Sequence, residues 1–219
     1  MPLDIARLRL HNQQIAGATF NQPSDVVAWL GAVQAQDYLG ALWAVGLRMR
    51  NAVEADIERA LANRTIIRTW PMRGTLHFVA AADVRWMIEL LTPRIVAGSA
   101  RRLHQQFGLD EATFARGKEL FARALQGGKQ LTRNAMYKAL EAGGISTDGQ
   151  RGLHILGRLA HDGVICFGAR VGKQQTFALL DELVIAPTPF AKLKRAETRA
   201  IAEAASRYGK FLDVSVVLP

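Results

Sequence analysis

The sequence predicts a mainly helical protein of the α+β class that carries two small β-hairpins. Apolar residues recur with helical spacing along most of the chain, and two short segments rich in β-branched and aromatic residues interrupt that pattern. The order of several helices followed by a hairpin occurs twice. We therefore expect strands near residues 65–79 and 164–180, helices elsewhere, and no continuous sheet of five or more strands.

Four helices are predicted before the first hairpin. Their apolar residues recur three or four positions apart, as on the buried face of a helix. We expect the first of them to face the core through Ile5, Leu8 and Leu10. The four predicted helices cover residues 3–15, 23–30, 39–47 and 54–62.

The first predicted hairpin joins residues 65–70 to residues 74–79 through a turn at Pro71-Met72-Arg73-Gly74. Strand alternation places Leu76 and Phe78 on one face and Thr75 and His77 on the other. We expect one of these faces to be available to a partner.

The second half repeats this order of elements. Helices are predicted over residues 81–96, 111–125, 133–141 and 151–161, followed by a hairpin of residues 164–167 and 176–180 around Gly172-Lys173. Thr132 is placed to cap the third of these helices, and Leu153, Leu156 and Leu159 should point inward from the fourth.

Three helices closed by a β-hairpin follow the winged-helix plan, a variant of the helix-turn-helix. Gly98-Ser99-Ala100-Arg101-Arg102 interrupts the apolar pattern, so we place a boundary between residues 98 and 108. The chain then divides into a first winged-helix domain (residues 1–98), a second (residues 108–186) and the start of a truncated third unit (residues 187–219), with one helix over residues 196–208.

The charge of the chain favours a polyanionic partner. Twenty-eight Lys and Arg residues against nineteen Asp and Glu give a formal net charge of +9. Cations and aromatic or polar groups gather in and beside the two hairpins, where they suit phosphate and base contacts, although an exposed wing with solubilising charges is the alternative. These candidate DNA-binding residues are Arg64, Arg68, Trp70, Arg73, Thr75, His77, Arg170 and Lys173.

The sequence predicts a cytoplasmic protein without membrane contact. Residues 1–7 lack the features of a secretory signal, and no apolar run is long enough to span a bilayer. The single Cys166 cannot form an internal disulfide, and its place in a predicted strand favours a buried thiol in a reducing cytosol.

Two amide side chains, Gln34 and Gln36, flank Ala35. In a regular helix they would point about 200° apart, so they can converge only where the chain is extended or leaves helical geometry. Taken alone, such a pair is typical of surface glutamines.

Several enzyme classes find no support. Gly127-Gly128-Lys129-Gln130 lacks the leading glycine and the Ser or Thr of a phosphate-binding loop. His154 and His161 share a helix face without a third metal ligand, and we expect them at the core edge or facing a groove. No Gly-x-Ser-x-Gly elbow is present, and Cys166 has no identifiable base, so acyl transfer is unsupported.

Two motifs resemble the AlkZ-like DNA glycosylases, a winged-helix family that includes the YcaQ type. They are Val33-Gln34-Ala35-Gln36 and Arg68-Thr69-Trp70-Pro71-Met72-Arg73-Gly74-Thr75-Leu76-His77. The resemblance extends through Leu131-Thr132-Arg133 and the hairpin of residues 163–180, and so covers most of residues 3–190. Members of this family usually continue into a third winged helix, whereas this chain closes soon after residue 208.

The resemblance implies a monofunctional glycosylase that excises N7-alkylated or bulky, crosslinked purines from duplex DNA. It assigns catalysis to Gln34 and Gln36, and Gln36 in the second position is similar to the AlkZ branch rather than the YcaQ branch. No metal or cofactor is implied, and the expected partner is double-stranded DNA bound by a nucleoid-associated monomer. The alternative is a non-catalytic winged-helix DNA-binding protein such as a transcriptional regulator.

Overall fold

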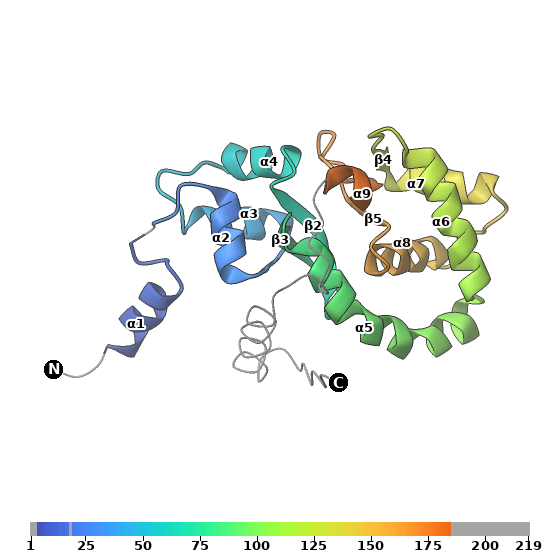
Figure 1. The fold of residues 1–219 in the computed structure, drawn as a ribbon, viewed down its shortest axis with the longest axis horizontal. Coiled ribbons are helices and arrows are strands. Elements are labelled where there is room, and N and C mark those ends of the chain that lie inside the picture. The colour runs from blue at the N-terminus through green and yellow to red at the C-terminus, as the bar shows by residue number, and fades with distance from the viewer. Residues whose placement is uncertain (1–3, 18, 185–219) are drawn as a thin grey trace.

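The computed structural model describes residues 4–17 and 19–184 (Figure 1). The chain is a mixture of helices and short strands, which confirms the predicted α+β class. The predicted third unit, residues 187–219 with its helix over 196–208, lies outside the described residues.

One order of elements, helix–strand–helix–helix–strand–strand, occurs twice. In each repeat the first strand pairs antiparallel with the third, β1 with β3 and β4 with β6. The first repeat comprises α2 (Pro23–Leu30), β1 (Val33–Gln34), α3 (Tyr38–Gly46), α4 (Glu54–Ala62), β2 (Ile66–Met72) and β3 (Thr75–Ala80). The second comprises α6 (Glu111–Leu125), β4 (Leu131–Thr132), α7 (Arg133–Ala142), α8 (Arg151–His161), β5 (Ile165–Phe167) and β6 (Thr176–Leu179), and a short α9 (Leu180–Leu183) follows.

The two hairpins lie where they were predicted, but they are not separate. Strand β2 pairs with β5 through Arg68 and Phe167, which joins all strands into one six-stranded sheet of order β1-β3-β2-β5-β6-β4. The prediction that no continuous sheet of five or more strands would form is therefore wrong. The pairing joins residues 99 positions apart, and nothing local in either strand indicates its partner.

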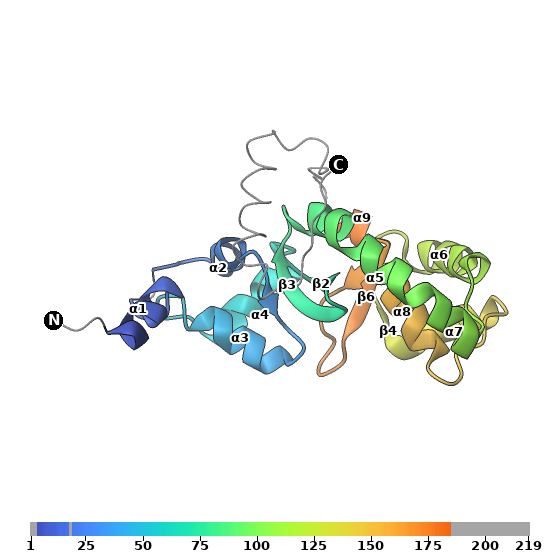
Figure 2. The ribbon, with the colours of Figure 1, turned by 90° about the horizontal axis from the view of Figure 1, so that it is seen from below.

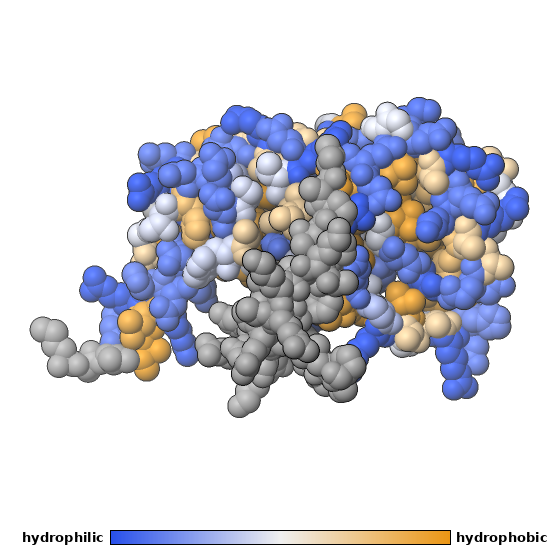
Figure 3. All heavy atoms as spheres, viewed as in Figure 1, coloured by the Kyte–Doolittle hydropathy of each residue, from blue (hydrophilic) through white to orange (hydrophobic). Residues whose placement is uncertain are grey.

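Helix α1 (Ile5–Asn12) has no buried residue, so the predicted core-facing role is wrong. Ile5, Leu8 and Leu10 are 58%, 44% and 46% exposed, and apolar residues of α1 form an orange patch at the lower left of Figure 3. At 100° per residue, Leu10 lies about 140° from Ile5 around the helix, so the three residues do not form one apolar stripe. Figure 1 shows α1 standing apart from the other helices.

Helix α5 (Val84–Phe107) joins the two repeats as one uninterrupted 24-residue helix. The helix predicted over residues 81–96 therefore continues to Phe107, because the small residues Gly98, Ser99 and Ala100 weaken the apolar pattern without ending the helix, and Leu103 returns to the core. Gly108, in the left-handed region at φ 59°, caps the helix. Helix α5 packs on β2 and on α8, and Figures 1 and 2 show it running between the repeats.

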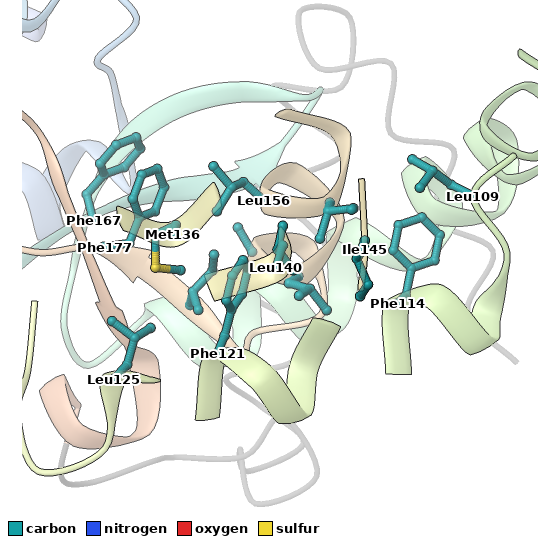
Figure 4. Close-up of a cluster of buried hydrophobic side chains, with 14 of the residues drawn as sticks. Leu109, Phe114, Phe121, Leu125, Met136, Leu140, Ile145, Leu156, Phe167 and Phe177 are labelled. Atoms are coloured by element: carbon teal, nitrogen blue, oxygen red, sulfur yellow. The ribbon is translucent and has the colours of Figure 1, made fainter. Parts of the chain in front are cut away.

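The second repeat has its own core, drawn in Figure 4. Phe114 and Phe121 from α6 meet Leu140 from α7 and Leu156 from α8 in this cluster. Thr132 caps α7 as predicted, and Leu156 and Leu159 are buried as predicted. Leu153 is 44% exposed, so the prediction that it points inward is wrong.

The first hairpin is covered on both faces, which corrects the prediction of a free face. Ile66 and Phe78 pack with the helices of the first repeat, whereas Ile67 and Val79 pack with residues of α5. Its tight turn lies at Arg73 and Gly74, both at positive φ, as a type I′ turn requires.

Candidate functional site

Gln34 and Gln36 lie on an extended segment at the edge of the sheet. Gln34 in β1 pairs with His77 in β3, and the amide of Ala35 donates to the carbonyl oxygen of Leu76 at 2.7 Å. Side chains alternate along an extended chain, so both glutamines point away from the buried Ala35. The condition for convergence, a chain that is extended or leaves helical geometry near Ala35, is met, because Ala35 lies between β1 and α3.

The Gln36 side chain is fixed by a hydrogen bond to the backbone of the hairpin. The amide nitrogen of Leu76 donates to Oε1 of Gln36 at 3.1 Å. A carbonyl oxygen has two lone pairs, so Oε1 can accept a second hydrogen bond, and the NH2 group keeps its two donors. Gln36 therefore presents a held amide to its surroundings.

Gln36 lines a cleft of about 430 Å³ between the first hairpin and the second repeat. Trp70, Gly74 and Leu76 line it on the hairpin side. The opposite wall comprises Ser99, Arg102, Arg133, His154, Arg158 and His161 among others from α5, α7 and α8. Among the described residues that line this cleft, Gln36 is present and Gln34 is not.

The three arginines in this wall, Arg102, Arg133 and Arg158, were not predicted as binding residues. Arg102 lies in the segment interpreted as a domain boundary, and Arg133 belongs to the Leu131-Thr132-Arg133 motif. Both are exposed, whereas the neighbouring Arg158 is paired with Glu111 at 2.7 Å and with Asp162 at 3.0 Å. The sequence did not indicate Arg102 and Arg133 as binding residues, because they lie far from the hairpins along the chain. Only folding brings α5 and α7 to this cleft.

His154 and His161 line the cleft, in agreement with the prediction that they face a groove. Burial lowers the pKa of both imidazoles, and nearby Arg102 lowers the pKa of His154 further. Their Nε2 atoms are buried without a hydrogen-bond partner among the described residues. Both rings are thus neutral near pH 7.

The predicted DNA-binding residues divide into exposed and buried groups. Arg73 and Lys173 are exposed at the tips of the two hairpins. Arg68 and His77 are only 6% and 8% exposed, which disfavours direct contact with DNA, and their assignment as DNA-binding residues stays a prediction. Local charge pattern cannot distinguish a buried guanidinium from an exposed one.

The other predicted contacts are partly engaged within the protein. Trp70 is half-buried, with its ring centroid 4.9 Å from that of Phe167, and Thr75, paired with Met72 in the hairpin, is half-buried too. Arg64 donates to the carbonyl oxygen of Glu182 at 3.2 Å, and Arg170 pairs with Glu58 at 3.5 Å. The five predicted cations therefore do not all belong to one exposed positive surface, because Arg68 is buried.

Arg68 and Arg170 flank the ring of Tyr38. Their guanidinium carbons lie 5.2 and 4.6 Å from the ring centroid, and the Tyr38 hydroxyl donates to Glu58 at 3.4 Å. These four residues line a second cavity of about 410 Å³. Burial lowers the pKa of Arg68 to about 10, so the guanidinium still carries its charge at pH 7.

Within residues 4–17 and 19–184, no three His, Cys, Asp or Glu side chains are grouped to hold a metal ion. No helix in the same ranges is long and apolar enough to cross a membrane.

Gln36 at a cleft with a partly basic wall, in a chain of two repeats, is consistent with the family that the sequence motifs resemble. A family model described as AlkZ-like DNA glycosylase matches residues 27–211. The chain belongs to the AlkZ-like DNA glycosylase family, which confirms the resemblance of its sequence motifs.

This chain is similar to a curated protein and to a solved structure, both from Streptomyces sahachiroi. One is the interstrand DNA cross-link repair glycosylase of Streptomyces sahachiroi, 27% identical over 179 residues, which are 78% of this chain and 47% of that protein. The other is the solved structure of Streptomyces sahachiroi DNA glycosylase AlkZ, with a TM-score of 0.68 and 27% identity over 79% of this chain and 47% of that one. The chain thus spans about half the length of these relatives.

Proposed function

We propose that this chain is a monofunctional DNA glycosylase that removes N7-alkylated or bulky, crosslinked purines from duplex DNA. The observation that carries the proposal is the extended segment of Gln34 and Gln36, with Gln36 held at the wall of a cleft, in a member of the AlkZ-like family. We also propose that it acts as a monomer on nucleoid DNA in the cytoplasm.

The two repeats are proposed to be winged-helix units. Their order of helices and strands, with the first strand paired to the third, is consistent with that plan. The boundaries at residues 98 and 108 fall at the C-terminal part of α5 and just after it, and the division into units stays a proposal.

The chemistry requires little acid catalysis. N7-alkylation makes the purine a cationic leaving group, so the C1′–N9 bond breaks with its electron pair leaving on the base. Water then supplies the oxygen at C1′ and releases a proton. The site must orient that water and stabilise positive charge on the sugar, which the amide dipoles of Gln34 and Gln36 can do.

The cleft is large enough to receive part of an extruded nucleotide, since ligand pockets commonly span about 300–1,000 Å³ and this one has about 430 Å³. Enzymes that act on a base in duplex DNA take it out of the stack and hold it with aromatic and polar groups. Trp70, Arg102 and His161 offer such groups opposite or beside Gln36. Arg102 and Arg133, together with Arg73 and Lys173 at the hairpin tips, can contact phosphates.

The experiment that tests the proposal measures free base released from a duplex with one N7-methylguanine. We expect the wild-type protein to release the base and leave an abasic site, without cutting the strand. Duplex affinity should fall steeply with salt, because each phosphate contact releases counterions. Tight duplex binding with no base release would favour the alternative of a non-catalytic DNA-binding protein.

A further inference from the structure

At the centre of the Gln34–Gln36 segment, the carbonyl oxygen of Ala35 does not accept the backbone hydrogen bond that regular pairing with β3 would give it. The amide of Ala35 donates to the carbonyl oxygen of Leu76, and a regular antiparallel pair would return a bond from the Leu76 amide to the Ala35 oxygen. Instead, Nε and a terminal nitrogen of Arg68 donate to that oxygen, at 3.2 and 2.7 Å. The Leu76 amide donates to Oε1 of Gln36.

The Arg68 guanidinium is held in place before any substrate binds. Arg68 is paired in β2 with Phe78 of β3 and with Phe167 of β5, which fixes its backbone on both sides. Its guanidinium carbon lies 4.8 Å from the Phe167 ring centroid and 5.2 Å from that of Tyr38. The two aromatic rings and the two hydrogen bonds to the Ala35 oxygen together hold the planar guanidinium in one orientation.

We propose that Arg68 is a positioning residue for Gln36. By occupying the Ala35 oxygen, it leaves the Leu76 amide without its ladder partner, and that amide then orients the Gln36 carboxamide at the cleft. The catalytic consequence of this geometry rests on the proposed glycosylase function, whereas the geometry itself does not.

Lysine cannot substitute for this arrangement. An ammonium group is a compact point charge that cannot make the planar, two-nitrogen contact while it stacks on two rings. In the Arg68→Lys variant, the Ala35 oxygen is free to accept from Leu76, and the Gln36 side chain loses the donor that holds it. Gln36 should then move as a free surface glutamine.

The test compares Arg68→Lys and Arg68→Gln with Arg48→Lys. Arg48 is the matched control, because it is also a buried arginine with two bonds to backbone oxygens, of Gln13 and Ala44, and it is absent from the lining of the cleft. Arg68→Gln removes the buried charge, so it should fold even where a lysine is not tolerated. Urea unfolding first establishes that each variant is folded.

The first readout is the side-chain amide NMR signal of Gln36, assigned by its loss in Gln36→Ala. We expect it to move to the position of a mobile glutamine in both Arg68 variants and to stay unchanged in Arg48→Lys. The second readout is single-turnover base release, which should fall by about tenfold to a hundredfold with duplex Kd nearly unchanged, as expected for a misplaced group.

The two readouts separate the two proposals. If the wild-type protein releases no base, the glycosylase proposal fails, and the Gln36 signal still decides the role of Arg68. Folded Arg68 variants in which the Gln36 signal keeps its wild-type position would overturn the positioning role. A base-release rate that falls equally in Arg48→Lys would also overturn it, because the loss would then reflect general destabilisation.

Discussion

At the scale of single residues, the site depends on groups that do not titrate near neutral pH. Gln34 and Gln36 bring neutral amides, and Arg68 keeps its charge although burial lowers its pKa to about 10. His77 is neutral, because burial lowers its pKa, and its Nδ1 donates to the carbonyl oxygen of Thr75 at 2.9 Å. A site built in this way suits a reaction whose leaving group already carries positive charge.

Cys166 provides a residue-scale prediction. It is completely buried in β5, and burial raises the pKa of its thiol to about 12. Because the thiolate is the reactive form, we expect Cys166 in the folded protein to react with a disulfide reagent at least about a hundredfold more slowly than in urea. The measurement is the rate of thiol labelling at pH 8 with and without denaturant, and equal rates would contradict the described burial.

At the scale of elements, the helices are predictable and their partners are not. Residues 54–62 and 111–125 are helical with the predicted bounds, because their apolar periodicity and their capping are local. The burial of Arg68 against Ala35 and the pairing of β2 with β5 involve residues 33 and 99 positions apart. The charges of one segment and its alternation of apolar and polar residues carry no information about such long-range contacts.

Helix α8 offers an element-scale prediction from two glycines on the same helix. A Cβ at Gly152 would lie 2.6 Å from a Tyr137 ring carbon and 3.0 Å from Thr147, whereas a Cβ at Gly157 meets nothing within 4 Å. Gly152→Ala should destabilise the fold by about 1–3 kcal/mol through overpacking. Gly157→Ala should stabilise it by up to about 1 kcal/mol, since alanine favours a helix.

Urea unfolding at neutral pH measures both effects. Each substitution is the control for the other, because both add the same methyl group to the same helix. If Gly152→Ala were as stable as Gly157→Ala, the close packing of α8 on Tyr137 would be contradicted.

At the scale of the whole molecule, one sheet, helix α5 and two apolar clusters unite the two repeats. Leu76 and the half-buried Trp70 from the first hairpin join the core of the second repeat, so the cleft beside Gln36 is formed by both repeats together. The sequence predicts the glutamines and the hairpins that border this cleft. It does not predict its basic far wall, since Arg102 and Arg133 belong to elements that approach only after folding.

Stability should depend on pH through three histidines. Burial lowers the pKa of His77, His154 and His161 in the folded protein, so below about pH 6.5 the unfolded chain binds more protons than the folded one. The contribution of these histidines to the free energy of unfolding is therefore present above about pH 6.5. It is lost as the pH falls toward their lowered pKa values in the folded protein. We expect the urea midpoint to fall between about pH 7 and about pH 5.5, and His161→Leu should reduce that dependence.

The catalytic claim concerns the amides of Gln34 and Gln36 together. The most direct measurement is single-turnover release of N7-methylguanine from a duplex by the wild-type protein, by Gln34→Ala/Gln36→Ala and by Gln126→Ala. Gln126 is the matched control, an exposed glutamine at the end of α6 that is absent from the lining of the cleft.

We predict that the double variant releases base at least about a hundredfold more slowly than the wild type, equivalent to about 3 kcal/mol of transition-state stabilisation. Its duplex Kd should be nearly unchanged, because affinity is expected to rest on the arginines of the cleft wall and on Arg73 and Lys173 at the hairpin tips, and Gln126→Ala should behave as wild type. Base release by the double variant at the wild-type rate would contradict the catalytic assignment of both glutamines.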